Sequence, residues 1–173
     1  GNVIASANGN GIRVGYDLGS FSVNDVTARD SDGIYVGHNL GGAPSTIAGD
    51  IQAGSYGVYV GNNLTSKLTV DSGASITSTN DAIHVSGTNS GGIENRGTLD
   101  SSAGSGIAVD QGNTSLILNY AGATISVHGD GIVVGYVGSP MPATNTSNIT
   151  NSGTIDSTTG SGIHVIGDNG DDV

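Results

Sequence analysis

Residues 106–109 read Gly106-Ile107-Ala108-Val109, and this pattern of glycine, isoleucine, any residue and valine decides the fold because it returns along the whole chain. The pattern has seven copies, which begin at Gly11, Gly33, Gly57, Ala82, Gly106, Gly131 and Gly162. In one copy Ala82 replaces the glycine, and in another Val58 replaces the isoleucine. The intervals between these positions are 22, 24, 25, 24, 25 and 31 residues. A repeat of about 20 to 50 residues is typical of a solenoid, in which each repeat buries its apolar face by stacking on its neighbours.

The stretch from Ile83 to Gly106 shows how one repeat is built. Ile83 and Val85 alternate with His84, which is the pattern of a short strand with one buried face. Two more short strands follow, one at residues 93–95 and one around Leu99, separated by polar and glycine-rich turns. Three strands and three turns per repeat predict an all-β fold: a right-handed parallel β-helix with three sheets and about 24 residues per coil.

Other apolar and polar positions keep the same period. An apolar residue central to the third strand precedes the next Gly-Ile copy by six or seven residues. These residues are Val26, Ile51, Ile76, Leu99, Ile125 and Ile155. Asn95, Asn119 and Asn151 each close a second strand, and we expect Asp71 at the same place one coil earlier. Because stacked Asn side chains form hydrogen-bonded ladders, we predict an asparagine ladder at this corner.

We predict one β-helix domain over residues 1–173, with six to seven coils. The 31-residue interval breaks the period and contains two of the three prolines, which cannot donate to a β-ladder. It therefore predicts an inserted loop at residues 137–146. The chain begins and ends within a coil and without a recognisable cap, so we expect either flanking coils of a longer chain or another molecule to cover its ends.

Composition limits the core and the partners. With 31 glycines, 4% aromatic residues and no Trp, the chain is suited to a narrow aliphatic core. Its net charge of −11 disfavours nucleic acid and anionic membranes, and no apolar run is long enough for membrane insertion. The absence of Cys excludes disulfides, thiolate zinc sites and cysteine nucleophiles.

Two segments carry a family resemblance. The segment Ile93 to Asp100, followed by Gly104 to Val109, matches Ile149 to Asp156 followed by Gly160 to Val165. This sequence of Ile-x-Asn-x-Gly-Thr and then Gly-Ile-x-Val resembles the passenger repeats of bacterial autotransporters, over most of the chain. The resemblance implies an exported protein that is extracellular or held at the bacterial cell surface.

The outward column of the first sheet is the candidate contact surface. Its residues are Arg13, Tyr35, Tyr59, His84, Ala108, Val133 and His164. We expect Tyr35 and Tyr59 to stack, which stabilises a sheet without any ligand. The same exposed strip of Tyr35, Tyr59 and His84 suits contact with a host or matrix glycan or protein, so both interpretations stay open.

Catalysis and metal binding are the less favoured alternatives. Asp25 and Asp50 occupy equivalent places on adjacent coils, as Asp100 and Asp156 do two coils apart, and paired carboxylates serve glycoside hydrolysis. No long loops or aromatic platform accompany them, so we predict no enzyme activity and no cofactor. Calcium stays an alternative at the acidic turns of residues 30–32 and 168–172.

The leading hypothesis is a non-enzymatic extracellular rod with a structural or adhesive role at a bacterial surface. The first alternative is a filament subunit that self-associates end to end, with Ile12 and Val14 of one molecule meeting Ile163 and Val165 of the next. The second is a polysaccharide-degrading β-helix enzyme. The alternation also predicts that Ile107→Asp is severely destabilising and that Ala108→Asp is nearly silent.

Overall fold

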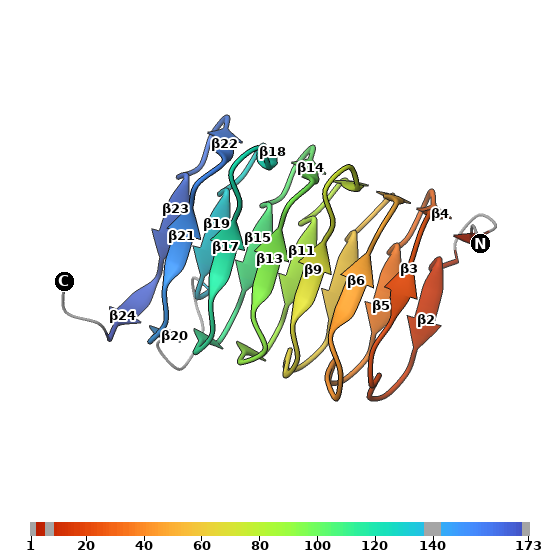
Figure 1. The fold of residues 1–173 in the computed structure, drawn as a ribbon, viewed down its shortest axis with the longest axis horizontal. Helices are drawn as coiled ribbons and strands as arrows, with labels where there is room; N and C mark the ends of the chain where they lie inside the picture. The colour runs from red at the N-terminus through yellow and green to blue at the C-terminus, as the bar shows by residue number, and fades with distance from the viewer. Residues whose placement is uncertain (1–2, 6–8, 137–142, 171–173) are drawn as a thin grey trace.

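The computed structural model describes residues 3–5, 9–136 and 143–170, and these form one stack of coils (Figure 1). All regular elements among them are short β-strands, and all strand pairs are parallel. Partners on neighbouring coils are mostly 24 or 25 residues apart in sequence, as in Ile83↔Ile107 and Ile107↔Ile132. The predicted parallel β-solenoid is therefore confirmed. No helix that could cross a membrane occurs in this described part of the chain.

The predicted three sheets run along the stack. Sheet 1 holds the Gly-Ile-x-Val copies: β2 (Ile12–Val14), β5 (Ile34–Val36), β8 (Val58–Val60), β11 (Ile83–Val85), β15 (Ile107–Val109), β19 (Ile132–Val134) and β23 (Ile163–Val165). Sheet 2 contains β3 (Ser22–Val23), β6 (Ser45–Ile47), β9 (Leu68–Val70), β13 (Ile93–Asn95), β17 (Ile117–Asn119) and β21 (Ile149–Asn151). Sheet 3 contains β1 (Val3–Ile4), β4 (Val26–Ala28), β7 (Asp50–Ala53), β10 (Ser75–Ser78), β14 (Thr98–Ser101), β18 (Thr124–Val127) and β22 (Thr154–Ser157).

A fourth, shorter ladder, which we name the corner ladder, lies between sheets 1 and 2. Its strands are β12 (Thr88–Asn89), β16 (Gly112–Asn113), β20 (Ala143–Asn145) and β24 (Gly167–Asn169). Single bridges from Leu18 to Leu40, Leu40 to Leu64 and Leu64 to Asn89 continue it through the earlier coils. The corner ladder was not predicted, because a column that changes from Leu to Asn has no repeated residue type.

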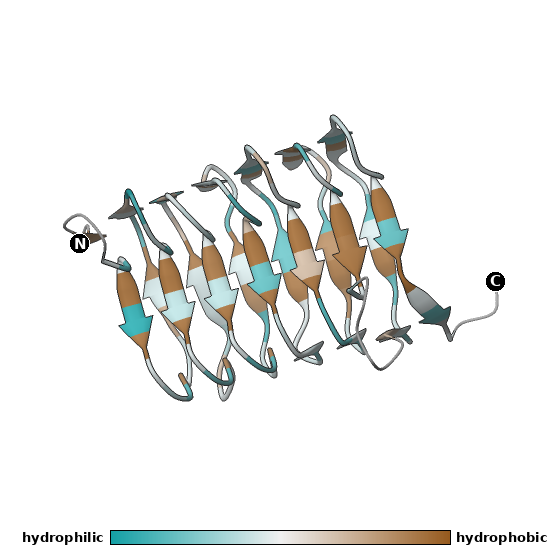
Figure 2. Cartoon of the chain, turned by 180° about the vertical axis from the view of Figure 1, so that it is seen from behind, coloured by the Kyte–Doolittle hydropathy of each residue, from teal (hydrophilic) through white to brown (hydrophobic). Residues whose placement is uncertain are grey.

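The core is the narrow aliphatic column that the composition predicts. Isoleucine and valine of the sheet 1 strands alternate with outward residues, and in the interior coils the inward side chains are fully buried. Figure 2 shows this alternation in most sheet 1 strands as apolar ends on either side of a more polar centre, whereas β19, which reads Ile-Val-Val, is apolar throughout. The third-strand column is also confirmed, since Val26, Ile51, Ile76, Leu99, Ile125 and Ile155 are paired in order.

The glycine of the motif is needed because sheet 3 approaches it closely. A Cβ added at Gly106 would collide with Cγ2 of Ile125 and would lie 2.6 Å from the Gly131 carbonyl oxygen. Gly33 and Gly57 have the same conflict with the β-branched residue that faces them. In the fourth copy Ala82 replaces glycine, and the equivalent sheet 3 residue is Leu99, which branches one carbon further out. The copy without glycine and the sheet 3 residue without β-branching therefore occur in the same coil.

Two asparagine ladders lie at the corners, and their members are buried except for Asn151 at the outer coil. At the end of sheet 2, Asn95 Nδ2 donates to Asn119 Oδ1 and Asn119 Nδ2 donates to Asn151 Oδ1, both at 2.8 Å. This confirms the predicted ladder, but the pairing places Val70, and not Asp71, one coil before Asn95. The second ladder lies in the corner ladder, where Asn89 donates to Asn113 at 2.7 Å and Asn113 donates to Asn145 at 2.8 Å.

The inserted loop extends less far than predicted. Ala143–Asn145, within the predicted 137–146 segment, forms strand β20 and pairs with β16 and β24. The reason is that Asn145 continues the buried asparagine ladder of the corner ladder. Residues 137–142 lie outside the described part of the chain.

Candidate functional site

The outward column of sheet 1, here called the sheet 1 strip, carries a stack of rings. Tyr35 and Tyr59 are 5.3 Å apart between ring centroids with planes at 7°, and Tyr59 and His84 are 5.4 Å apart at 4°. The Arg13 guanidinium carbon lies 5.1 Å from the Tyr35 centroid. The strip follows from the strand register, which places one such residue per coil. The predicted Tyr35–Tyr59 stack is therefore confirmed, and His84 extends it.

His84 is held between two carboxylates, one from the turn before its own strand β11 and one from the turn after the adjacent strand β15. Its Nδ1 lies 2.8 Å from Asp81 Oδ2, and its Nε2 lies 3.3 Å from Asp110 Oδ2. Burial of the ring lowers the pKa, but the hydrogen bonds with Asp110 and Asp81 outweigh it and raise the pKa of His84 to about 9. The imidazole is thus a cation at neutral pH and donates from both nitrogens.

Tyr56 closes one side of this cluster. It comes from the turn before β8, and its ring tilts against Tyr59 at 5.3 Å and against His84 at 4.9 Å. Burial, followed by the negative charge of Asp81, raises the pKa of Tyr56 above its ordinary value. The phenol therefore remains neutral over the physiological pH range.

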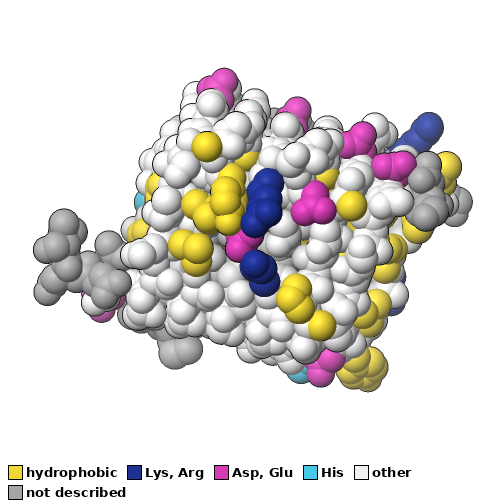
Figure 3. All heavy atoms as spheres, viewed as in Figure 1, with side chains coloured by type: hydrophobic (Ala, Val, Ile, Leu, Met, Phe, Trp, Pro, Cys, Tyr) yellow, Lys and Arg dark blue, Asp and Glu magenta, His cyan; other side chains and the backbone are white. Residues whose placement is uncertain are grey.

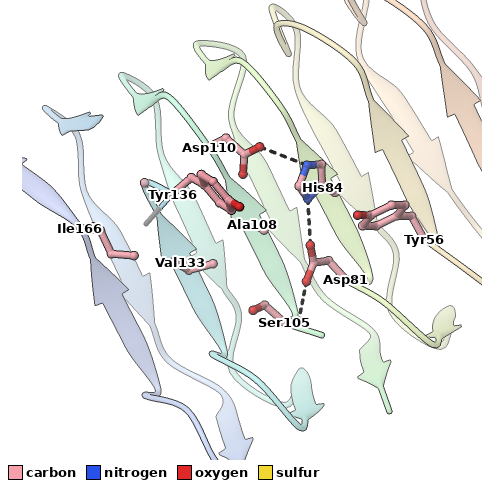
Figure 4. Close-up of a pocket in the computed structure, with 10 residues that line it drawn as sticks. Tyr56, Asp81, His84, Ser105, Ala108, Asp110, Val133, Tyr136 and Ile166 are labelled. Atoms are coloured by element: carbon pink, nitrogen blue, oxygen red, sulfur yellow. Dashed lines mark hydrogen bonds and ion pairs between the residues drawn. The ribbon is translucent and has the colours of Figure 1, made fainter. Parts of the chain in front are cut away.

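A hollow of about 300 Å³ begins where the stacked rings end (Figure 4). The next two residues of the strip, Ala108 and Val133, have small side chains, so among the described residues the space above them is left open. The other residues that line it are Tyr56, Asp81, His84, Ser105, Asp110, Gly135, Tyr136 and Ile166. The arrangement combines an apolar floor with aromatic and carboxylate walls, which is the usual composition of a small-molecule site.

A second polar cluster lies on sheet 2, on the side of the stack that Figure 3 shows. Glu94 Oε1 accepts from Lys67 Nζ at 3.0 Å, and Oε2 accepts from Arg96 at 2.8 Å. The Arg96 guanidinium also stacks 4.5 Å from the Tyr120 centroid. Burial opposes ionisation of Glu94, but Lys67 and Arg96 lower its pKa overall. Figure 3 shows the two basic side chains on either side of an acidic one.

The predicted carboxylate pairs lie along sheet 3, and the first pair is hydrogen-bonded within the stack. Asp25 Oδ1 accepts from the backbone N–H of Asp50 at 3.0 Å, and Asp50 Oδ1 accepts from Ser75 Oγ at 2.7 Å. Asp100 and Asp156 occupy the same outward column of sheet 3, with Ser126 between them, as predicted. None of the four lines the hollow on sheet 1.

The candidate calcium turns show no assembled metal site in the described residues. Asp32 Oδ1 accepts from the backbone N–H of Tyr56 at 3.2 Å, and Asp168 is exposed in β24. Residues 171–172 of the second turn lie outside the described part. Within the described ranges, no group of three or more His, Cys, Asp or Glu side chains is placed to hold a metal ion.

The candidate end-to-end residues lie at opposite ends of the stack (Figure 1). Ile12 and Val14 belong to β2, which pairs with β5, and Ile163 and Val165 belong to β23, which pairs with β19. Ile163 is 41% exposed, whereas Ile132 one coil earlier is fully buried. Each of these outermost strands is paired on one edge only among the described residues, and apolar side chains lie beside the other edge.

Sequence reasoning missed Asp81, Asp110 and Tyr136 as site residues, because they lie in turns and approach one another only across coils. Their offsets from the Gly-Ile-x-Val copies contain the available signal: Asp81 comes immediately before one copy, Asp110 comes immediately after another, and Tyr136 is the second residue after a third. No protein-family model, curated protein or solved structure matches the chain.

Proposed function

We propose that the chain is a non-enzymatic rod at a bacterial surface, which makes adhesive contacts through the sheet 1 strip. The observation that carries this proposal is the strip itself: Arg13, Tyr35, Tyr59 and His84 form one stacked row across four coils. Tyrosine and arginine are the residue types that contribute most to protein contact surfaces. The repeated coil supplies a rigid support on which this row is held.

The buried groups of the stack support a structural role for the rest of the molecule. The core is aliphatic, and buried asparagines are hydrogen-bonded to one another between coils. Two of the carboxylates that suggested hydrolysis, Asp25 and Asp50, accept hydrogen bonds within their own ladder. The extracellular location rests on the resemblance to autotransporter passenger repeats.

Adhesion of coated beads tests the proposal. Beads carrying the chain are expected to bind host cells or extracellular matrix, and Tyr35→Ser with Tyr59→Ser is expected to reduce binding at least fivefold. The matched control is Gln52→Ser with Thr77→Ser, two outward residues on adjacent coils of sheet 3. Equal loss with both variants, or no binding by the wild type, would contradict an adhesive strip. Release of reducing sugar from a glycan panel would contradict the non-enzymatic assignment.

A second candidate function, an end-to-end filament, is favoured by the exposed Ile163 at the outer strand of sheet 1. A second copy placed there would continue the same inward–outward alternation from Val165 to Val14. Its test belongs to the whole molecule and is given in the Discussion.

A further inference from the structure

The sheet 1 strip contains a gap that is shaped by the sequence. Large flat side chains occupy three consecutive coils at Tyr35, Tyr59 and His84, and the strip then changes to Ala108 and Val133. One face of the His84 ring stacks on Tyr59, and the other side opens toward Ala108. The row of rings therefore ends at a hollow of about 300 Å³.

The floor and the far end of this hollow are apolar. Ala108 and Val133 form the floor, and Ile166 lies at the far end, one coil further along the stack. Figure 4 shows Tyr136 beside Ala108 and Val133, on the side of His84 away from Tyr56. Tyr136 is 63% exposed, so its ring is accessible to a ligand. An aromatic face above an apolar floor suits the C–H face of a saturated ring.

The polar groups at the edge of the hollow accept hydrogen bonds. Asp81 uses Oδ2 for His84 and Oδ1 for the backbone N–H of Ser105, at 2.8 and 2.7 Å. Asp110 uses Oδ2 for His84, and within the described residues its Oδ1 has no hydrogen-bond partner. A carboxylate oxygen of this kind accepts from a hydroxyl group. The two carboxylates and one imidazolium leave a single negative charge, which disfavours an anionic ligand.

We propose that this hollow binds one uncharged pyranose ring of a glycan, with its C–H face over Ala108 and Val133 and a hydroxyl that donates to Asp110 Oδ1. The site deepens the adhesive role proposed above, since it names the ligand class, and it rests on that function. The volume lies at the lower limit of small-molecule sites, so it suits one ring with its hydroxyls and leaves the rest of the glycan outside.

Methyl-detected NMR of the whole chain tests the site. The probes are methyl glycosides of glucose, galactose, mannose and N-acetylglucosamine, with glucuronic acid and tyramine as charged comparisons. At least one neutral glycoside is expected to shift the methyl signals of Ala108, Val133 and Ile166, with a dissociation constant on the order of 1 mM, as for ligands of about a dozen non-hydrogen atoms.

Variants then separate the site from the fold. Ala108→Tyr fills the hollow with a ring in the column of Tyr59 and His84, so it should reduce binding at least tenfold and leave thermal unfolding cooperative. Tyr136→Ala should weaken binding, and Tyr120→Ala, an aromatic control on the sheet 2 face, should not. Binding that persists in Ala108→Tyr, a preference for glucuronic acid or tyramine, or no shift with any glycoside would overturn the proposal. Bead adhesion that depends on Tyr35 and Tyr59, together with no glycoside shifts, would leave the adhesive strip standing and reject this site alone.

Discussion

His84 belongs to the stacked rings of the sheet 1 strip and also forms ion pairs with carboxylates in two turns. Its ring stacks on Tyr59, contacts Tyr56 and is placed between Asp81 and Asp110. Only 13% of its side chain is exposed, so these charges interact with little screening by solvent. Such a bridged imidazolium makes folding depend on pH through one residue.

The pKa of His84 predicts loss of stability in mild alkali. The folded pKa of about 9 lies above the ordinary 6.5, so the cation stabilises the fold fully below about pH 6.5, and this stabilisation is lost as the pH rises through 9. The expected contribution is up to about 3 kcal/mol. Urea unfolding at pH 6 and pH 9.5 measures it.

His84→Gln should remove most of this pH dependence. The control is His128→Gln, because His128 is exposed and its ring contacts Thr158. Equal loss of unfolding free energy between pH 6 and pH 9.5 in wild type and His84→Gln would contradict the assignment of the effect to His84.

The pair Ala82 and Leu99 gives a second prediction at the scale of single residues. Gly106→Ala should destabilise the chain by about 1–3 kcal/mol, because the new methyl group overlaps Ile125 Cγ2. Adding Ile125→Leu should recover part of this loss, since it reproduces the combination that Ala82 and Leu99 form in the fourth copy. Chemical denaturation of both single variants and the double variant measures the coupling. Strict additivity would show that Ile125 is not the group that requires glycine.

The inward–outward alternation predicted from the sequence is confirmed at Ile107. At Ala108 it predicts the direction of the side chain but not how exposed that side chain is. Ile107 is fully buried, so Ile107→Asp is still expected to cost several kcal/mol. Ala108 points outward, as predicted, but it is only 5% exposed at the base of the hollow. The expectation that Ala108→Asp is nearly silent stays untested, and the buried position now leads us to expect destabilisation, because the new carboxylate would be buried in the hollow that Asp110 also lines. The alternation along a strand predicts the direction in which a side chain points, whereas the exposure of that side chain also depends on the turns of neighbouring coils.

The elements of this fold are single strands of two to four residues, and neither the strands nor the coils are stable alone. Their register was predictable because the Gly-Ile copies and the third-strand column repeat one residue type. The corner ladder was not, because Leu18, Leu40 and Leu64 share a column with Asn89, Asn113 and Asn145. The column keeps its place in the backbone while its chemistry changes from apolar packing to amide hydrogen bonds.

This change predicts a difference between single and concerted substitutions. Asn113→Leu should cost about 2–4 kcal/mol, because Asn89 Nδ2 loses its 2.7 Å acceptor and keeps only a 3.5 Å contact with the Ser115 carbonyl. Replacing Asn89, Asn113 and Asn145 together by Leu should cost less than three times the single change, since the earlier coils already stack Leu in this column. Thermal unfolding compares the two. A triple variant that loses more than the sum would show that the amides are required individually.

At the scale of the molecule, the acidic surface and the outer strands act in opposite directions. A net charge of −11 keeps chains apart at low salt, whereas β2 and β23, each of which has only one partner strand among the described residues, template further pairing. The filament alternative therefore predicts concentration-dependent oligomers in sedimentation velocity, strengthened by salt. Ile163→Lys should prevent them, and Thr150→Lys, an exposed outward change in the same coil, should not. A wild-type chain that stays monomeric at all concentrations and salt levels would reject the filament.

The period of the sequence is the period of the stack, and every site described above depends on it. One outward column of sheet 3 runs Thr27, Gln52, Thr77, Asp100, Ser126 and Asp156. Because the chain has no Cys, pairs of introduced cysteines can carry nitroxide spin labels without other changes. Distances between labels then report the number of coils between them.

Pulsed electron resonance on two labelled pairs is the most direct test. At about 4.8 Å per coil, labels at Gln52 and Asp156, four coils apart, should be centred near 19 Å, and labels at Thr27 and Asp156 near 24 Å. The increase of about 5 Å for one added coil is the predicted result. Distances that do not increase by one strand spacing between the two pairs, or that exceed about 35 Å, would contradict the stacked coil.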